Sequence, residues 1–216
     1  MDIVSCLAAG VAAYLLGSIP TGFLVAQARG VDIRTVGSGN IGATNVLRAL
    51  GRGAGGFVLL VDTLKGWLAV AVMPRLLILL LGTTTEARGG GLEILQIISG
   101  VCAILGHNYT CWLQFKGGKG IATSAGVLLA LVPWALLIIL SVWIVIFSAT
   151  RYVSLGSLAA AAALPVASWL THESLTKVIV TGALGALAMY KHKTNIRRLL
   201  DGTEPRFQRK GREGAQ

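Results

Sequence analysis

Charged residues are scarce in this chain, and acidic residues are the scarcest of them. Only 13% of the 216 residues are Asp, Glu, Lys or Arg, whereas soluble domains carry about 25%. Hydrophobic residues make up 54% of the chain, and the mean hydropathy is +0.72. This balance excludes a soluble globular domain and predicts an all-α polytopic membrane protein.

Signatures of several common chemistries are missing as well. The three cysteines, Cys6, Cys102 and Cys111, lack the spacing of zinc ligands, so we expect packing residues and no metal site. A Walker A motif, Gly-x4-Gly-Lys-Ser/Thr, aligned on Gly118 and Lys119 would need a glycine where Leu113 stands, so ATP hydrolysis is not indicated. None of the histidines is followed five residues later by aspartate, which disfavours the His-x4-Asp acyltransferases. No cofactor is expected.

The shortage of acidic residues leaves a net charge of +10, which is unevenly distributed. Basic residues gather in segments 29–52, 116–119 and 191–216, whereas 82–91 holds only Arg88. Because the chain is membrane-embedded, we expect its partners to be membrane lipid and phosphorylated substrates, and not nucleic acid. The positive-inside rule places the three segments in the cytoplasm, with the N-terminus outside and a basic cytoplasmic tail at about 191–216.

The apolar blocks predict about seven transmembrane helices, some of them short, in a single domain over 1–216. These blocks lie at roughly 3–26, 55–81, 92–113, 121–149, 154–170 and 174–190. Parity between two cytoplasmic segments requires 121–149 to cross twice or not at all. As one helix it would be about 43 Å long, too long for a core of about 30 Å. We therefore predict two short helices bent near Pro133. The alternative is five crossings, with 154–190 partly re-entrant.

The segment Phe115–Gly120 is the most informative stretch of the chain. Its glycines Gly117, Gly118 and Gly120 let backbone N–H groups turn toward an anion, and Lys116 and Lys119 add charge. The residues after it are typical of a helix start, which also favours anions. The sequence therefore predicts a phosphate site rather than a flexible linker. Spacing alone leaves open which lysine contacts the phosphate.

A second glycine-rich segment covers Val36–Arg48. Its Gly-x-Gly-x-x-Gly pattern matches the dinucleotide fingerprint only formally, because no βαβ unit surrounds it. Thr44 and Arg48 are spaced to share one helix face. The alternative is an interfacial loop whose Arg48 extends to lipid headgroups. The candidate polar and backbone contacts here are Ser38, Gly39, Asn40, Thr44, Asn45 and Arg48.

Two further pairs of polar residues stand at helical spacing. Asp62 and Lys65 are expected to form a structural ion pair near the cytoplasmic end of the second span. His192 and Asn195 would share a face if the last helix continues, where histidine can move a proton and asparagine can orient a hydroxyl or phosphate. The alternative for the second pair is a basic juxtamembrane anchor.

Taken together, these segments resemble the PlsY family of bacterial membrane-integral glycerol-3-phosphate acyltransferases, which use acyl phosphate as donor. The resemblance spans nearly the whole chain in the expected order. One departure is Thr110, where the family usually has proline, within a stretch, Asn108–Gln114, that is atypical of the family; it leaves the local loop shape open and the implied chemistry unchanged. The matching segments are Tyr14–Pro20, Gly37–Asn45, Asp62–Gly66, Gly106–His107, Phe115–Thr123, Arg151–Leu155 and His192–Leu199.

The resemblance implies a seven-helix bundle in the bacterial inner membrane with a cytoplasmic active site. The implied reaction is acyl phosphate plus glycerol 3-phosphate giving 1-acylglycerol 3-phosphate and phosphate, a step of phospholipid biosynthesis coupled to an enzyme that produces acyl phosphate. It implies catalytic importance for Ser38, Arg48, His192 and Asn195, substrate contacts in the glycine-lysine loop and at Ser154, and a structural role for Glu204.

Two mechanisms and two other functions stay open at this point. His192 could accept the hydroxyl proton, or a substrate phosphate could accept it while His192 and Asn195 orient the hydroxyl. We slightly favour the phosphate, because no carboxylate stands at a fixed spacing to orient His192. An organophosphate transporter would need an inverted repeat, which is not found, and a lipid-binding scaffold would leave the glycine-lysine loop unexplained.

Overall fold

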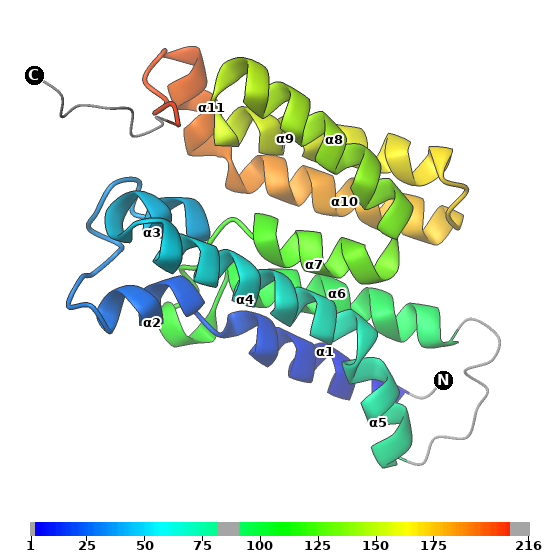
Figure 1. Ribbon diagram of the computed structural model, residues 1–216. Coiled ribbons are helices and arrows are strands. Elements are labelled where there is room, and N and C mark those ends of the chain that lie inside the picture. Colours follow the sequence, from blue (N-terminus) through cyan, green and yellow to red (C-terminus); the bar gives the residue numbers. More distant parts are fainter. Residues whose placement is uncertain (1–2, 82–90, 208–216) are drawn as a thin grey trace, which may run out of the picture. The chain divides into compact units, whose positions relative to one another are not determined.

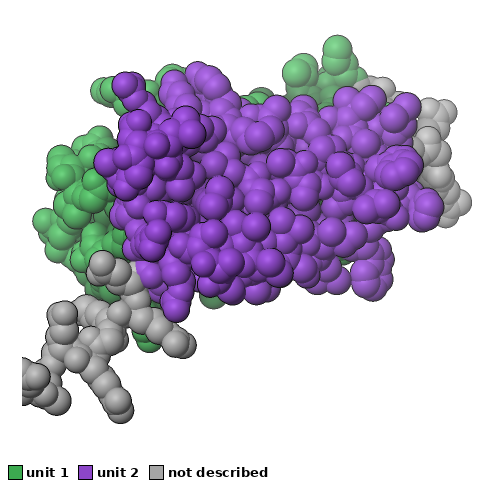
Figure 2. All heavy atoms as spheres, turned by 90° about the horizontal axis from the view of Figure 1, so that it is seen from above, with its two compact units in different colours: residues 1–133 green, residues 134–216 purple. Residues whose placement is uncertain are grey.

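The computed structural model describes residues 3–81 and 91–207, and every regular element in these two ranges is a helix. The described chain divides into two compact units, residues 1–133 and 134–216 (Figure 2). The predicted all-α class is confirmed, and the single domain over 1–216 stays a prediction. Arg88 and the end of the basic tail, with Arg209, Lys210 and Arg212, lie outside the described residues.

The first unit consists of helices that run lengthwise beside one another, with the short helices α2 and α3 at one end and the short α5 at the other (Figure 1). Hydrophobic residues of the short helices and their loops form one core cluster around Ile33, Val46 and Val58. A second cluster joins Ala13, Ala69 and Ala103, with Cys102 packed against it as predicted for a small apolar residue. The elements are α1 (Ile3–Ser18), α2 (Thr21–Gln27), α3 (Ala43–Leu50), α4 (Arg52–Ala71), α5 (Met73–Leu81), α6 (Gly91–Asn108), the 3₁₀ turn η2 (Cys111–Leu113) and α7 (Ile121–Leu131).

Glycines allow the long helices of this unit to approach closely. A Cβ atom added at Gly17 would lie 2.0 Å from the carbonyl oxygen of Ala103, so α1 and α6 are in backbone contact there. The same holds for α4 and α7, where a Cβ at Gly66 would lie 2.1 Å from the carbonyl oxygen of Thr123. Contacts between small residues of this kind hold membrane helices together. In lipid there is no hydrophobic driving force for helices to associate, so close van der Waals packing has to supply the attraction.

The second unit contains α8 (Pro133–Thr150), α9 (Val153–Leu170), α10 (Leu175–Lys191) and the short α11 (Lys193–Leu200). Helices α9 and α10 form an antiparallel pair, with Gly185 packed against the backbone of Ala161. A ring stack joins Trp143 and Phe147, whose centroids are 4.8 Å apart. The sharp turn between α8 and α9 places Arg151 in the left-handed region, with φ at 63°.

Five helical segments among the described residues are long and apolar enough to cross a membrane. They are Ile3–Gln27, Arg52–Ala71, Gly91–Leu113, Pro133–Thr150 and Val153–Leu170. The apolar helix α7 has 11 residues and α10 has 17, so both are shorter than these. The chain is therefore a multi-pass membrane protein, and the count of seven crossings and the orientation of the termini stay predictions.

The predicted break near Pro133 is confirmed, but the expectation of two short halves is wrong for the second. Helix α7 ends at Leu131 and α8 begins at Pro133. Proline has no N–H to donate, and the first turn of a helix needs none, so Pro133 starts α8 instead of bending it. Helix α8 therefore has 18 residues and is about 27 Å long, which is close to a full crossing of the hydrocarbon core.

Candidate active site

The loop between α2 and α3 is organised around the buried side chain of Asn45. Its Oδ1 accepts a hydrogen bond from the N–H of Ser38 at 3.1 Å. Its Nδ2 lies 2.9 Å from the carbonyl oxygens of Val36 and Asn40 and donates to the loop from the inside. Sequence analysis proposed Asn45 as a substrate contact, whereas the structure gives its amide a role in shaping the loop that presents Ser38.

Ser38 and Arg48 lie on the exposed side of this arrangement. Helix α3 begins at Ala43, so Thr44 and Arg48 share one face of it, as their spacing predicted. Arg34 is held elsewhere, because its guanidinium forms a bidentate pair with Asp32, at 2.8 Å for the shortest contact. Hydrogen bonds from Arg34 lower the pKa of Asp32 to about 2, so the pair persists at neutral pH.

The glycine-lysine loop folds back onto the end of α6. The N–H of Gly117 donates to the carbonyl of Asn108 at 3.2 Å, and the N–H of Gly118 donates to that of His107 at 3.0 Å. The predicted anion cradle is therefore wrong for these two N–H groups, which are used within the protein. Gly120 has φ of 79° and caps α7, so the N–H groups of the first turn of α7, from Gly120 onward, are those that helix geometry leaves for an anion.

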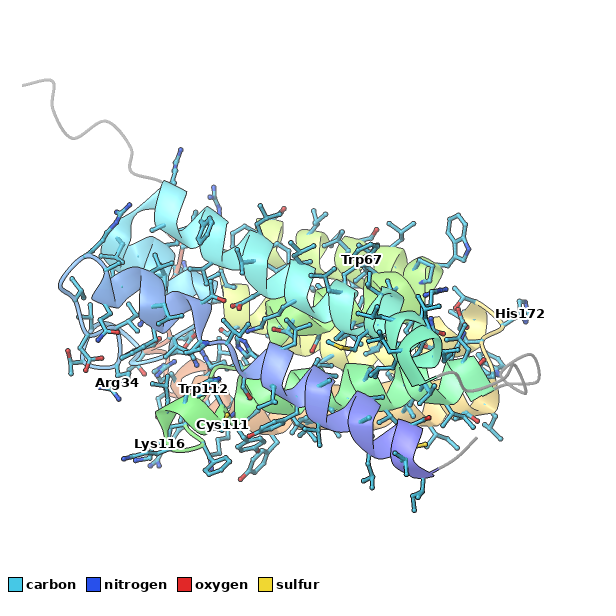
Figure 3. The ribbon with its side chains drawn as sticks, turned by 90° about the horizontal axis from the view of Figure 1, so that it is seen from below. Arg34, Trp67, Cys111, Trp112, Lys116 and His172 are labelled. Carbon is cyan, nitrogen blue, oxygen red and sulfur yellow. The ribbon has the colours of Figure 1, made fainter. Side chains whose placement is uncertain are left out.

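The two lysines of the loop differ in their surroundings. Lys116 is exposed and lies beside Cys111 and Trp112, at the same end of the first unit as Arg34 (Figure 3). Lys119 is half-buried between the buried glycines Gly118 and Gly120. A cation at the start of α7 adds to the partial positive charge of the helix N-terminus. Of the two, Lys119 is the better placed to neutralise a phosphate there.

Thr110, where the family usually has proline, fits the same turn by another route. Its φ is −64°, which is the value that proline imposes. Its hydroxyl is fully buried and donates to the carbonyl oxygen of Ser18 at 2.5 Å. That carbonyl lies at the end of α1, where helical carbonyls lack intrahelical partners. A hydrogen bond therefore stands where proline would supply a rigid ring, and the φ angle of Thr110 is one that proline adopts.

A buried ionic network lies beneath the glycine-lysine loop. Lys65 Nζ is 2.8 Å from Asp62 Oδ1 and donates to the carbonyl oxygen of Ile19 at 2.8 Å. Asp62 also accepts a hydrogen bond from Thr21 at 3.0 Å. The predicted ion pair is confirmed, but it lies in the middle of α4 and not near its end. Both side chains are at least 96% buried, because Lys65 is 4% exposed and Asp62 is 2% exposed.

In the second unit, His192 marks a break in the last helix. Helix α10 ends at Lys191 and α11 begins at Lys193, so the helix is interrupted at His192. The prediction that His192 and Asn195 share one helix face required a continuous helix, and this condition is not met. The ring nitrogen Nδ1 lies 2.8 Å from the carbonyl oxygen of Ala188. A carbonyl only accepts, so Nδ1 carries a proton and Nε2 of the neutral ring carries the lone pair.

Asn195 belongs to a buried polar cluster with Glu204. Its Nδ2 donates to Glu204 Oε1 at 2.7 Å, and Arg198 Nε donates to Glu204 Oε2 at 2.7 Å. Burial opposes the charge on Glu204, but the Ser154 hydroxyl, Arg198 and Asn195 outweigh it and lower the pKa of this carboxyl below its ordinary value. The carboxylate therefore fixes the amide of Asn195 with its oxygen turned away from Glu204.

The segment after α11 returns to the turn between α8 and α9. The N–H of Phe207 donates to the carbonyl of Arg151 at 2.8 Å, and Arg206 Nε donates to the hydroxyl of Tyr152 at 3.0 Å. The ring of Phe207 meets that of Phe147 edge-on. Glu204 thus lies on a segment that is tied down on both sides, which agrees with a structural role.

The structure brings the predicted residues together in two groups, one in each unit. In the first unit, the Ser38–Arg48 segment and the glycine-lysine loop lie at the same end (Figure 1). In the second, His192, Asn195, Ser154 and Glu204 surround the α10–α11 junction. That the two groups form one site stays a prediction. Sequence reasoning missed Arg198 and the carbonyl partner of His192, although the acid–base pairing of Arg198 with Glu204 at six residues could have suggested the former.

Comparisons with known proteins cover nearly the whole chain. A sequence profile described as glycerol-3-phosphate acyltransferase matches residues 7–202. The curated glycerol-3-phosphate acyltransferases of Geobacter sulfurreducens and Geotalea daltonii are 47% and 45% identical, covering 90% and 92% of this chain and 94% and 96% of those proteins.

Two solved structures of PlsY, an integral membrane glycerol 3-phosphate acyltransferase, have the same fold. Its glycerol 3-phosphate form aligns with a TM-score of 0.82 at 40% identity, and its lysophosphatidic acid form with 0.80 at 39%. Each alignment covers 94% of this chain and 96% of that one. Profile, curated relatives and fold agree over the same residues, and this chain therefore belongs to the PlsY family of membrane-integral glycerol-3-phosphate acyltransferases.

Proposed function

We propose that this protein transfers an acyl group from acyl phosphate to the 1-hydroxyl of glycerol 3-phosphate, giving lysophosphatidic acid and phosphate. The observation that carries the proposal is the likeness, over 94% of the chain, to a structure described as a glycerol 3-phosphate form and to one described as a lysophosphatidic acid form. Acyl phosphate as donor rests on the family resemblance and on the cationic groups available for two phosphates.

An acyl phosphate is already activated, so the protein mainly has to position two phosphates and one hydroxyl. Lys119 and the first turn of α7 would hold the phosphate of glycerol 3-phosphate. Arg48 and Ser38, presented by the loop that Asn45 organises, would hold the phosphate of the donor and stabilise the charge that develops when it leaves. The new ester bond forms at the 1-hydroxyl oxygen, and the acyl–phosphate C–O bond breaks.

His192 and Asn195 would orient the attacking hydroxyl. The bond from His192 Nδ1 to Ala188 fixes the ring and leaves the lone pair on Nε2, so this nitrogen accepts a hydrogen bond. The hydroxyl proton then passes to a substrate phosphate. We expect His192→Gln to lower kcat by less than about a hundredfold with KM little changed, because glutamine can still accept a hydrogen bond. Steady-state kinetics test this, since a loss of kcat of about 10²–10⁴, the usual contribution of a general base, would make His192 the base.

The basic segments support a location in the bacterial inner membrane with the active site facing the cytoplasm. Arg29–Arg52, Lys116–Lys119 and Lys191–Arg206 carry the positive charge that marks cytoplasmic loops. Lysophosphatidic acid and acyl donor share the bilayer, so an enzyme that produces acyl phosphate at the same membrane would supply this one.

The reaction is tested with purified protein in detergent or nanodiscs and labelled glycerol 3-phosphate. Lysophosphatidic acid should form with acyl phosphate as donor and not with acyl-CoA. Arg48→Ala should lower kcat/KM by at least about a hundredfold, since it removes a charge from the developing transition state. Arg197→Ala is the matched control, because that arginine is also exposed, at 87%. A folded sample that forms no product from acyl phosphate contradicts the proposal.

A further inference from the structure

His107 stands between the buried ion pair and the glycine-lysine loop. It lies near the end of α6 and is 5% exposed. Its Nδ1 is 3.1 Å from Lys65 Nζ and 3.8 Å from Asp62 Oδ1. On its other side, the loop residue Gly118 is bonded to the carbonyl oxygen of His107. One residue therefore contacts both the ionic network of α4 and the loop assigned above to phosphate.

The contact with Lys65 fixes the protonation of the ring. An ammonium group only donates, so Nδ1 must accept and the proton of the neutral ring resides on Nε2. In a doubly protonated ring, the Nδ1–H group would face the Lys65 ammonium at 3.1 Å. Two charged donors at this distance in a buried site repel each other, so the ring is neutral. The Nε2 edge of His107 consequently faces away from the ion pair.

That edge lies directly under Gly118. A Cβ added at Gly118 would be 2.2 Å from Nε2, 3.0 Å from Cδ2 and 3.1 Å from Cε1. All three nearest atoms belong to the His107 ring, and the backbone of Gly118 is not in the left-handed region, so an alanine here would be opposed by the ring alone. Gly118 is a glycine because the imidazole occupies the position of its side chain.

The geometry points to His107 as a positioning residue for glycerol 3-phosphate. Its Nδ1 accepts from Lys65, whose ammonium group Asp62 holds in place, and its Nε2 edge fixes the position of Gly118 and hence of Lys119. This inference rests on the proposed function of the loop. The buried ion pair then has a second task, since it holds the ring that supports the substrate loop. Neither His107 nor the pair touches the reacting atoms.

Two substitutions separate the two sides of the ring. In His107→Asn, Oδ1 replaces Nδ1 as acceptor for Lys65, while the edge under Gly118 is lost. In His107→Gln, the amide reaches the position of Nε2, while the acceptor for Lys65 is lost. We expect H107N to raise KM for glycerol 3-phosphate about tenfold, without changing KM for acyl phosphate, and to keep its melting temperature. H107Q should show the reverse, with a lower melting temperature and a KM within about threefold of the wild type.

A double-mutant cycle with Gly118→Ala tests the contact itself. G118A alone should raise KM for glycerol 3-phosphate about tenfold, because the methyl group displaces the loop from the ring. In H107N/G118A, the methyl group fills the space that the ring edge left, so KM should fall below that of either single variant. H107Q/G118A keeps the clash and should stay impaired. If the effects of H107N and G118A simply multiply, or if H107N leaves KM unchanged, the inference is overturned.

The same cycle distinguishes this inference from the proposed function. A wild-type protein that does not acylate glycerol 3-phosphate overturns the function. The contact is then read from melting temperatures, where G118A should be destabilised by several degrees and H107N/G118A should recover. Absence of recovery there rejects the positioning role whether or not the enzyme reaction is as proposed.

Discussion

Gly66→Ala is expected to prevent stable folding of the first unit and to abolish activity. A Cβ at Gly66 would lie 2.1 Å from the carbonyl oxygen of Thr123, and one at Gly126 would lie 1.8 Å from that of Thr63. The opposing atoms are backbone, so no side chain can move aside. Helices α4 and α7 would have to separate, which would shift the start of α7 and the loop before it. Expression yield, melting temperature and turnover measure the effect.

Gly56→Ala is the matched control for this substitution. Gly56 is exposed on the same helix, and a Cβ there has no atom within 4 Å. Alanine has the higher helix propensity by about 1 kcal/mol, so this variant should be as stable as the wild type or more so. If G66A and G56A have the same melting temperature, the close approach of α4 and α7 does not stabilise the first unit.

Lys65→Met is expected to destabilise the protein by about 3–5 kcal/mol, the usual cost of removing one member of a buried ion pair and leaving the other charge uncompensated. The carboxylate of Asp62 would remain 2% exposed with Thr21 as its partner and no compensating charge. Adding Asp62→Leu removes the second charge, so the double variant should recover most of the loss. Denaturation in detergent, followed at several temperatures, measures both.

Lys177→Met is the control for the ion pair. Lys177 forms a comparable contact with Glu173, at 2.9 Å, but the side chains are 18% and 14% exposed. Water and salt screen this pair more strongly, so K177M should cost less than about 1 kcal/mol. A double variant as unstable as K65M alone would mean that the two side chains matter through packing and not through charge.

The features that could be predicted from the sequence are those that depend on residue type. The helix start after Gly120, the break at Pro133 and the pairing of Asp62 with Lys65 follow from glycine, proline and charge spacing, and all three are present. The predicted cradle failed at Gly117 and Gly118 because their N–H groups bond to carbonyls, and every residue offers a carbonyl.

The same reason explains the missed orientation of His192. The search was for a carboxylate at fixed spacing, whereas the partner is the carbonyl of Ala188, one helical turn earlier. Asn45 was likewise expected to contact substrate because of its polar side chain, and it bonds instead to the backbone of its own loop. Backbone partners are set by the fold, so they become visible only once the helices are placed.

The close contact of α7 with the middle of α4 has a consequence for how a fatty substrate is handled. The two helices run in the same direction (Figure 1). Gly66 lies fourteen residues beyond Arg52, whereas Thr123 lies two beyond Ile121, so the start of α7 lies roughly 18 Å along α4 from its first residue. Pulling an acyl chain out of the bilayer costs about 0.8 kcal/mol for each methylene. We expect glycerol 3-phosphate, the small polar substrate, to reach the acyl donor at this distance along α4, so that the acyl chain stays in the lipid throughout.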